Sequence, residues 1–408
     1  MKKIYYWLSF VLLIGACLPE APGLVLCDGV ALVENALPFE ALYQTNRAQL
    51  TTVDGLGALL SGHSDTMLHA TFFITETLTA HTDVSQADFN NLASVLPLHT
   101  TAYFTHKQQV LLMGGVNNTI DDLVTWVNQD SLFSDKIIKY DVATQQLANV
   151  DAHLLVPRAG HTTTKVTDGV IEEVLVVGGN LDTAKCSLIT ASYEPYFVTN
   201  NSHTLRVNRY LHKATAWQNS AGSTCVLITG GQKSNDGSIV GEAELYQYRV
   251  GFLEETIEQK EPRLFHTATF IEKNNTVILT GGQSNQGVIK ATIEAYDITN
   301  KLFLKEEEPM KVARAKHTAT CLPDKNWLLI VGGQAANGAA INSIELYADG
   351  KTYLLEQSLL QARFNHATIF VRDEFNPAKG YLLVFGGCNE QNTPLKHEFL
   401  TVYLECPY

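Results

Sequence analysis

Histidine and arginine recur along the chain at fixed positions relative to each other. Six histidines lie 15–20 residues ahead of a pair of glycines, and five of them follow an arginine by three residues. The histidines are His99, His161, His212, His266, His317 and His366. The arginines are Arg158, Arg209, Arg263, Arg314 and Arg363. Imidazole groups could bind a metal, and guanidinium groups could bind an anion.

A structural role for these two rows is the favoured interpretation. A residue that occupies one position of every repeat usually serves the repeat itself. We therefore expect each arginine to pair with an acidic residue of its own repeat, and each histidine to satisfy backbone groups between repeats. The sequence contains no H-E-x-x-H, Walker, C-x-x-C or G-x-S-x-G motif. No catalytic residue, metal ion or cofactor is predicted.

The glycine pairs set the period of the repeat. They are Gly114-Gly115, Gly178-Gly179, Gly230-Gly231, Gly281-Gly282, Gly332-Gly333 and Gly386-Gly387. Their spacings are 64, 52, 51, 51 and 54 residues. A period of this size is typical of propeller blades and other repeat arrays.

Residues 261–303 form the clearest copy of the repeat. Two β-rich runs, HTATFI and TVILT, flank a polar turn, and the second run ends at Gly281-Gly282. A variable loop follows, then the run TIEAY ending at Asp297, and a last short run with Phe303. This is the pattern of three or four short strands joined by turns.

The order of glycine pair, tyrosine with a nearby acid, and a later aromatic residue resembles kelch repeats. The resemblance covers roughly residues 96–405, and it implies an all-β, kelch-type β-propeller. Residues 45–95 read as a degenerate first blade, which would make seven blades; the alternative is six blades with an irregular N-terminal cap. The last blade lacks a fourth strand, so a strand from 28–44 is expected to close the ring. Residues 83–96 are expected to form a short amphipathic helix.

The first residues resemble a bacterial secretion signal. Lys2 and Lys3 precede a short apolar run, and the sequence LIGAC ends at Cys17 like a lipobox. We therefore predict a signal peptide at 1–16, a lipidated Cys17 with a tether at 17–27, and the propeller at 28–408. An outer-membrane location in the bacterial envelope is expected. The alternative is an ordinary signal peptide and a soluble periplasmic protein.

Six further cysteines would lie in an oxidising compartment. Cys27 and Cys406 flank the expected closure of the ring and are candidates for a disulfide, the alternative being two free thiols. Cys225 and Cys321 lie in or at the end of apolar strands and are expected to be buried thiols. Cys186 and Cys388 follow glycine pairs of different repeats and are not expected to pair.

Charge and loop composition point to a binding protein. The net charge of −13 argues against nucleic acid. The polar loops after the glycine pairs favour a monomeric scaffold that binds a protein or a glycan through that face. The candidate contacts are the five repeated arginines with Gln232, Gln283, Gln334 and Trp126. An anionic partner is expected if the arginines reach the surface, and no such patch exists if each is neutralised within its own repeat. The alternative function is a sugar-acting periplasmic enzyme, resembling sialate mutarotases or galactose oxidase, with its site in the central funnel.

Overall fold

The computed structural model describes residues 25–27, 46–53, 57–64, 67–74, 79–83, 99–116, 133–144, 146–179, 185–190, 196–233, 235–255, 257–304, 307–322, 325–372, 378–393, 395 and 398–404. This part of the chain is built almost entirely of β-strands. The helical element within it is the short 3₁₀ helix η2 (Thr105–Lys107).

Seven antiparallel sheets of four or more strands follow one another along the described residues. Sheet 1 contains β2 (Asn46–Val53), β3 (Gly57–Ser64), β4 (Met67–Ile74) and β5 (Thr79–Asp83). Sheet 2 contains β6 (Thr100–Phe104), β7 (Gln109–Met113), β8 (Ser134–Asp141) and β9 (Gln146–Arg158). Sheet 3 contains β10 (Thr162–Thr167), β11 (Glu172–Val177), β12 (Lys185–Thr190) and β13 (Phe197–Thr204).

The second half of the chain continues the series. Sheet 4 contains β15 (Lys213–Gln218), β16 (Thr224–Thr229), β18 (Glu242–Gln247), β19 (Gly251–Phe252) and β20 (Ile257–Glu258). Sheet 5 contains β21 (Thr267–Ile271), β22 (Thr276–Thr280), β23 (Ile293–Asp297) and β24 (Leu302–Phe303). Sheet 6 contains β25 (Thr318–Leu322), β26 (Trp327–Val331), β27 (Ser343–Ala348) and β28 (Lys351–Ser358).

Sheet 7 joins the two ends of the chain. It contains β29 (Ala367–Arg372), β30 (Lys379–Phe385), β31 (Glu398–Tyr403) and β1 (Val25–Cys27). β1 lies antiparallel beside β31, with Leu26 opposite Val402. A separate two-stranded ladder pairs β14 (Arg209–Tyr210) with β17 (Gln232–Lys233).

The second strands of the sheets show why this sequence forms β-structure. β22 is the run TVILT and β26 is the run WLLIV, and nearly all of their residues are buried. Short runs of β-branched and leucine residues bounded by turn residues are typical of strands buried on both faces. Each run ends at a glycine pair with positive φ, such as Gly281 (φ 59°) and Gly282 (φ 101°), so the extended backbone cannot continue.

The hydrophobic core lies between consecutive sheets. One cluster packs Leu227 and Leu245 of sheet 4 against Val277, Leu279 and Tyr296 of sheet 5. Similar clusters combine sheets 2 and 3, sheets 3 and 4, sheets 5 and 6, and sheets 6 and 7. Burying apolar side chains between neighbours is the main stabilising term for a stack of small sheets.

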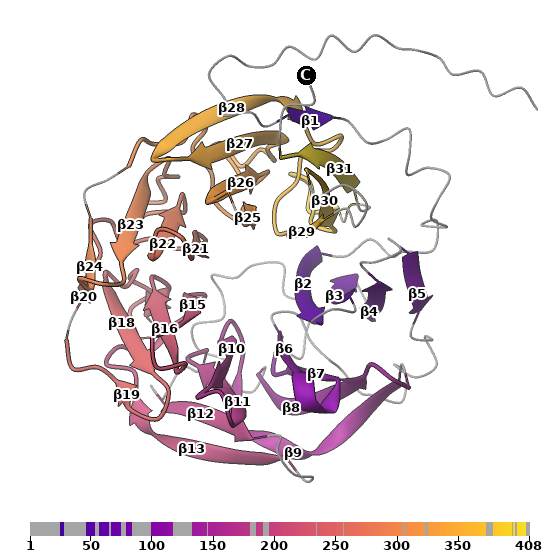
Figure 1. Ribbon diagram of the computed structural model, residues 1–408, viewed down its shortest axis with the longest axis vertical. Helices are drawn as coiled ribbons and strands as arrows, with labels where there is room; N and C mark the ends of the chain where they lie inside the picture. Colours follow the sequence, from indigo (N-terminus) through magenta and orange to yellow (C-terminus); the bar gives the residue numbers. More distant parts are fainter. Residues whose placement is uncertain are drawn as a thin grey trace, which may run out of the picture.

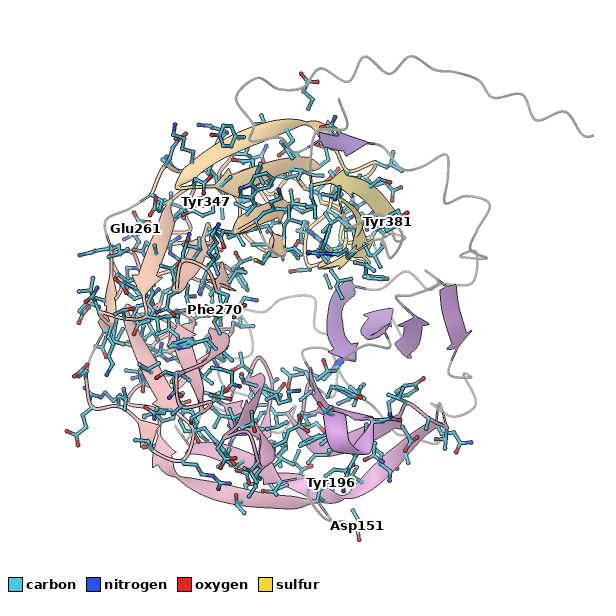
Figure 2. All side chains as sticks on the ribbon, in the orientation of Figure 1. Asp151, Tyr196, Glu261, Phe270, Tyr347 and Tyr381 are labelled. Atoms are coloured by element: carbon cyan, nitrogen blue, oxygen red, sulfur yellow. The ribbon has the colours of Figure 1, made fainter. Side chains whose placement is uncertain are left out.

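The sheets are arranged around a common centre (Figure 1). Their first strands lie nearest the centre and contact one another in order from β2 to β29, and β29 contacts β2. Phe270 of β21 accordingly lies toward the centre and Asp151 of β9 at the outer edge (Figure 2). The result is a propeller-like β fold.

Several expectations from the sequence can now be compared with these strands. Residues 45–95 do contain a four-stranded sheet, sheet 1. The strand that pairs with β31 is β1, residues 25–27, which lies in the segment expected to be a tether. The segment 28–44, which was expected to supply that strand, and residues 84–96 of the expected helix lie outside the described residues.

Candidate functional site

The five repeated arginines are buried inside the sheets. Each has 0% exposure. The Nη1 atom of each donates a hydrogen bond to the carbonyl of the first glycine in the next glycine pair along the chain; for Arg314 the acceptor is Gly332 at 2.8 Å. The same contact joins Arg158 to Gly178 and Arg363 to Gly386. The arginine therefore fixes the carbonyl that the end of the second strand leaves without a ladder partner.

Four of these arginines also form an ion pair with a glutamate on the third strand of the same sheet. Nη2 of Arg314 lies 2.6 Å from Oε1 of Glu345, and both side chains are fully buried. The other pairs are Arg209–Glu244, Arg263–Glu294 and Arg363–Glu398. This confirms the predicted pairing within the repeat.

Burial and ion pairing shift the pKa values of these arginines in opposite directions. Desolvation lowers the pKa of Arg209, Arg314 and Arg363, and the adjacent glutamate raises it in each case. Arg158 is equally buried, and desolvation lowers its pKa to about 10. A guanidinium group with no exposed surface cannot contact a partner, so this geometry argues against the predicted arginine contacts.

The glycine pair and the Arg-x-x-His sequence of the next sheet form one seam. The backbone N–H of Gly282 donates to the carbonyl of Arg314, 2.9 Å away, in the following sheet. A Cβ on Gly281 would lie 2.3 Å from that same carbonyl oxygen and 2.8 Å from a ring carbon of His317. Four other glycine pairs make the same contacts, which explains why both landmarks recur together.

The histidines complete the seam. Nε2 of His161 lies 2.7 Å from the hydroxyl of Thr100, and Nε2 of His212 lies 2.8 Å from the hydroxyl of Thr162. The partner in each case is a threonine of the preceding sheet, whereas the sequence predicted backbone groups. Burial lowers the pKa of His212 to about 3 and holds that of His161 well below its usual value, so both rings are neutral at pH 7.

The residue before five of the six histidines, where the structure describes it, has a left-handed backbone. Leu211, Phe265, Lys316 and Asn365 have φ between 54° and 56°, and Gly160 has φ 62°. Bulky residues rarely adopt this conformation. The N–H of Leu211 donates to Gly160, that of Lys316 to Phe265, and that of Asn365 to Lys316. Consecutive sheets are thus linked by backbone hydrogen bonds around the centre, and half-buried side chains of varied type occupy this position.

The three predicted glutamines hold the loops that follow the glycine pairs. Nε2 of Gln232 donates to the carbonyl of Gly237 at 2.6 Å, and Nε2 of Gln334 donates to that of Gly338 at 3.1 Å. Gln283 forms backbone bridges with Leu264 and Ile289. These side chains are half-buried, so the glutamines shape the loops as well as lining them.

A cavity of about 360 Å³ lies where the first strands of sheets 2, 3 and 4 begin. Its lining includes the seam residues His161 and His212 and the apolar side chains of Leu211 and Phe265. It also includes Lys213, the first residue of β15. Lys213 is accessible to water, yet enclosure by the protein lowers its pKa through desolvation. No motif marks Lys213 in the sequence, although it interrupts a row of threonines.

Some predicted residues lie outside the described residues: Trp126, Cys17 and Cys406. Cys27 lies opposite Thr401 in the β1–β31 ladder, so its pairing with Cys406 stays a prediction. Cys186, Cys225, Cys321 and Cys388 are free thiols; Cys225 is buried as expected, whereas Cys321, expected to be buried, is only half-buried. No group of three metal-binding side chains occurs among the residues that the structure describes. No helix in that part of the chain has the length and apolar character that a membrane crossing requires.

Comparison of the chain with protein-family models finds no match, and comparison with curated proteins finds none either. What the described residues define is an all-β protein of four-stranded antiparallel sheets in a propeller-like arrangement. The repeated seam of glycine pair, arginine and histidine is its structural signature.

Proposed function

We propose that this protein is a closed, seven-bladed propeller of the kelch type. Seven sheets with the same strand order support this proposal, as does the pairing of β1 with β31 from opposite ends of the chain. A strand from the start of the chain that covers the edge of the last sheet ties the two ends of such a ring together. The glycine pair, the arginine and the histidine of each repeat all have a physical role in the seam, and this supports the assignment of the repeat to the kelch type.

The propeller is held at the bacterial envelope by a lipid on Cys17 and faces its partners as a monomer. The support for this part is the lipobox-like sequence LIGAC after two lysines. An outer-membrane location follows from the leucine after Cys17. The membrane is contacted through the lipid alone.

The loops after the glycine pairs form the surface that binds a protein or a glycan. The observation that carries this proposal is the combination of a rigid loop base with an exposed tip. In sheet 5 the N–H of Ser284 donates to the carbonyl of Val288 at 2.9 Å, and Val288 itself is 60% exposed. In sheet 7 the side chain of Asn389 accepts hydrogen bonds from the N–H groups of Gln391 and Thr393. Rigid loops lose little entropy on binding.

Neighbouring loops are also connected. Oδ1 of Asn285, in the loop of sheet 5, accepts a hydrogen bond of 2.6 Å from the N–H of Ile239, in the loop of sheet 4. Loops that differ in sequence but share such supports form a continuous, adaptable surface on a fixed scaffold. The buried arginines support this surface from beneath and do not take part in contacts.

A pair of matched triple variants tests the binding face. The first places arginines at three exposed loop tips: Gln286→Arg, Ala336→Arg and Gln391→Arg. The second places three arginines in turns between the first and second strands, at the opposite end of the sheets: Val170→Arg, Ser220→Arg and Asn274→Arg. Both change the net charge by the same amount. The non-lipidated protein and both variants are tested against a glycan array and an array of envelope proteins.

We expect the tip variant to lose binding to the ligands that the unmodified protein retains, and the opposite-face variant to keep it. Loss in the opposite-face variant alone would contradict the assignment of the face. An absence of binding by the unmodified protein to both arrays would contradict the scaffold function itself.

A further inference from the structure

Lys213 occupies a position that is threonine in four of the other sheets. The residue after the seam histidine is Thr100 in sheet 2, Thr162 in sheet 3, Thr267 in sheet 5 and Thr318 in sheet 6. In sheet 4 it is Lys213, which starts β15 and lines the central cavity. The cavity lining contains no aspartate or glutamate. The backbone of Lys213 pairs with Thr229 in the ladder, but within the described residues its side chain forms neither a hydrogen bond nor an ion pair.

The nearby threonine hydroxyls are also hydrogen-bond donors toward the cavity. Nε2 of His161 and His212 contacts Thr100 and Thr162, whereas Nδ1 of each ring is buried and has no hydrogen-bond partner among the described residues. An N–H group without a partner costs more than a lone pair without one, because the donor loses its full solvation. The proton of each neutral ring therefore lies on Nε2 and is donated to the threonine oxygen. The hydroxyl proton of each threonine is left for an acceptor in the cavity.

The polar groups of the cavity lining thus include a cation and two hydroxyls with a free proton, while the hydroxyl of Thr163 donates to the carbonyl of Thr101. We propose that this cavity is a binding site for a small organic anion, whose carboxylate or phosphate group is held by Lys213, Thr100 and Thr162. The volume of about 360 Å³ suits a molecule the size of a monosaccharide. A cation beside hydroxyl donors favours an anion because a negatively charged oxygen accepts a charge-assisted hydrogen bond from each of them.

The mouth of the cavity provides the complementary apolar contacts. Leu211 and Phe265 line it from their left-handed positions before the seam histidines. Nζ of Lys316 lies 5.2 Å from the centre of the Phe265 ring and adds positive potential at the rim. An aromatic ring beside hydrogen-bond donors suits the apolar face and the hydroxyl groups of a sugar-sized ligand. The site is separate from the loop tips, so it does not depend on their partner.

Three ligands of similar size test the proposal by titration calorimetry with the full mature chain: glucuronate, glucose 6-phosphate and glucose. We expect one or both anions to bind at least tenfold more tightly than glucose, and the comparison of the two distinguishes a carboxylate from a phosphate ligand. The variant Lys213→Thr, which restores the residue used by the other sheets, is expected to weaken anion binding at least tenfold. Its folding is checked by thermal unfolding, and Lys213→Met replaces it if it is unstable.

Lys165→Thr is the matched control. Lys165 also lies on a first strand, β10, but it pairs with Glu172 at 3.1 Å and is not part of the cavity. We expect this variant to bind the anion like the unmodified protein. The proposal is overturned if neither anion binds, if glucose binds as well as the anions, or if the Lys213 variants bind unchanged.

Discussion

Removing one arginine of the repeated ion pairs should destabilise the folded protein. Arg314 makes hydrogen bonds to the carbonyls of Gly332 (2.8 Å) and Ser343 (3.0 Å) and an ion pair with Glu345 (2.6 Å). Arg314→Met would leave the fully buried Glu345 carboxylate without its cation. Breaking a buried pair by removing one partner costs about 3–5 kcal/mol, mostly because a charge stays buried without compensation. We expect the free energy of unfolding to fall by about this amount.

A double-mutant cycle separates the pair from the other contacts. Glu345 also accepts hydrogen bonds from the N–H groups of Lys311 and Val312, so Glu345→Leu is destabilising on its own. The variant with both substitutions should be less destabilised than the sum of the single variants by about 2 kcal/mol. Each single variant leaves one buried charge without its partner, whereas the double variant removes both charges. Urea unfolding, followed by circular dichroism and tryptophan fluorescence, measures these differences, and coincidence of the two signals checks that unfolding is cooperative.

A surface arginine provides the control. Arg249 pairs with Asp168 at 3.3 Å but is 47% exposed, and exposed pairs contribute less than about 1 kcal/mol. Arg249→Met should therefore be nearly neutral. The structural role assigned to the buried arginines would be refuted if Arg314→Met were equally mild, or if the two substitutions of the cycle were additive within about 0.5 kcal/mol.

Three further outcomes are expected. The first concerns pH: burial lowers the pKa of His212 and His366 to about 3 and holds those of His161, His266 and His317 well below the unfolded value of about 6.5. The stability from these neutral rings is fully present above pH 6.5 and is lost as the pH falls, by up to about 1.4 kcal/mol per histidine and pH unit; an unchanged urea midpoint between pH 7.5 and 5.5 would be inconsistent with this. The second concerns glycine: Gly281→Ala should lower the melting temperature much more than Gly338→Ala, because both have positive φ but only the first has a neighbour within 4 Å of the added Cβ. The third concerns the envelope anchor: mass spectrometry of membrane-extracted protein should find an acylated N-terminus at Cys17, and another N-terminus or no acyl mass would contradict lipidation.

The repeat could be predicted from the sequence because its physical causes are local. A buried strand must end somewhere, and Gly281-Gly282 ends β22 with a backbone that other residues rarely adopt. The pairing of Arg314 with Glu345 was predictable because a charge repeated in every unit needs a partner repeated in the same unit. The sequence could not show that the guanidinium groups are wholly buried, since burial depends on how the next sheet packs against them.

Other features depend on long-range packing and were missed. β1 has three residues, too few for a periodicity, and it pairs with a strand almost four hundred residues later. Leu211 and Phe265 carry no turn signature, because their left-handed backbone is imposed by the hydrogen bonds between sheets. Lys213 did leave a signal: the row of residues after the seam histidines reads Thr, Thr, Lys, Thr, Thr and Ala.

The hydrogen bonds of the seam show that the fold does not require a lysine at position 213. In sheets 2 and 3 the threonine after the seam histidine is the partner of the next histidine, but beside Lys213 the next histidine, His266, contacts Thr229 of β16 at 2.9 Å instead. The seam is therefore satisfied without Lys213 and gains nothing from a lysine there. Lys213 is exposed to water, and no carboxylate of the cavity lining pairs with it. A charged residue without a structural partner at a position where the seam does not need it is expected where a bound ligand supplies the partner.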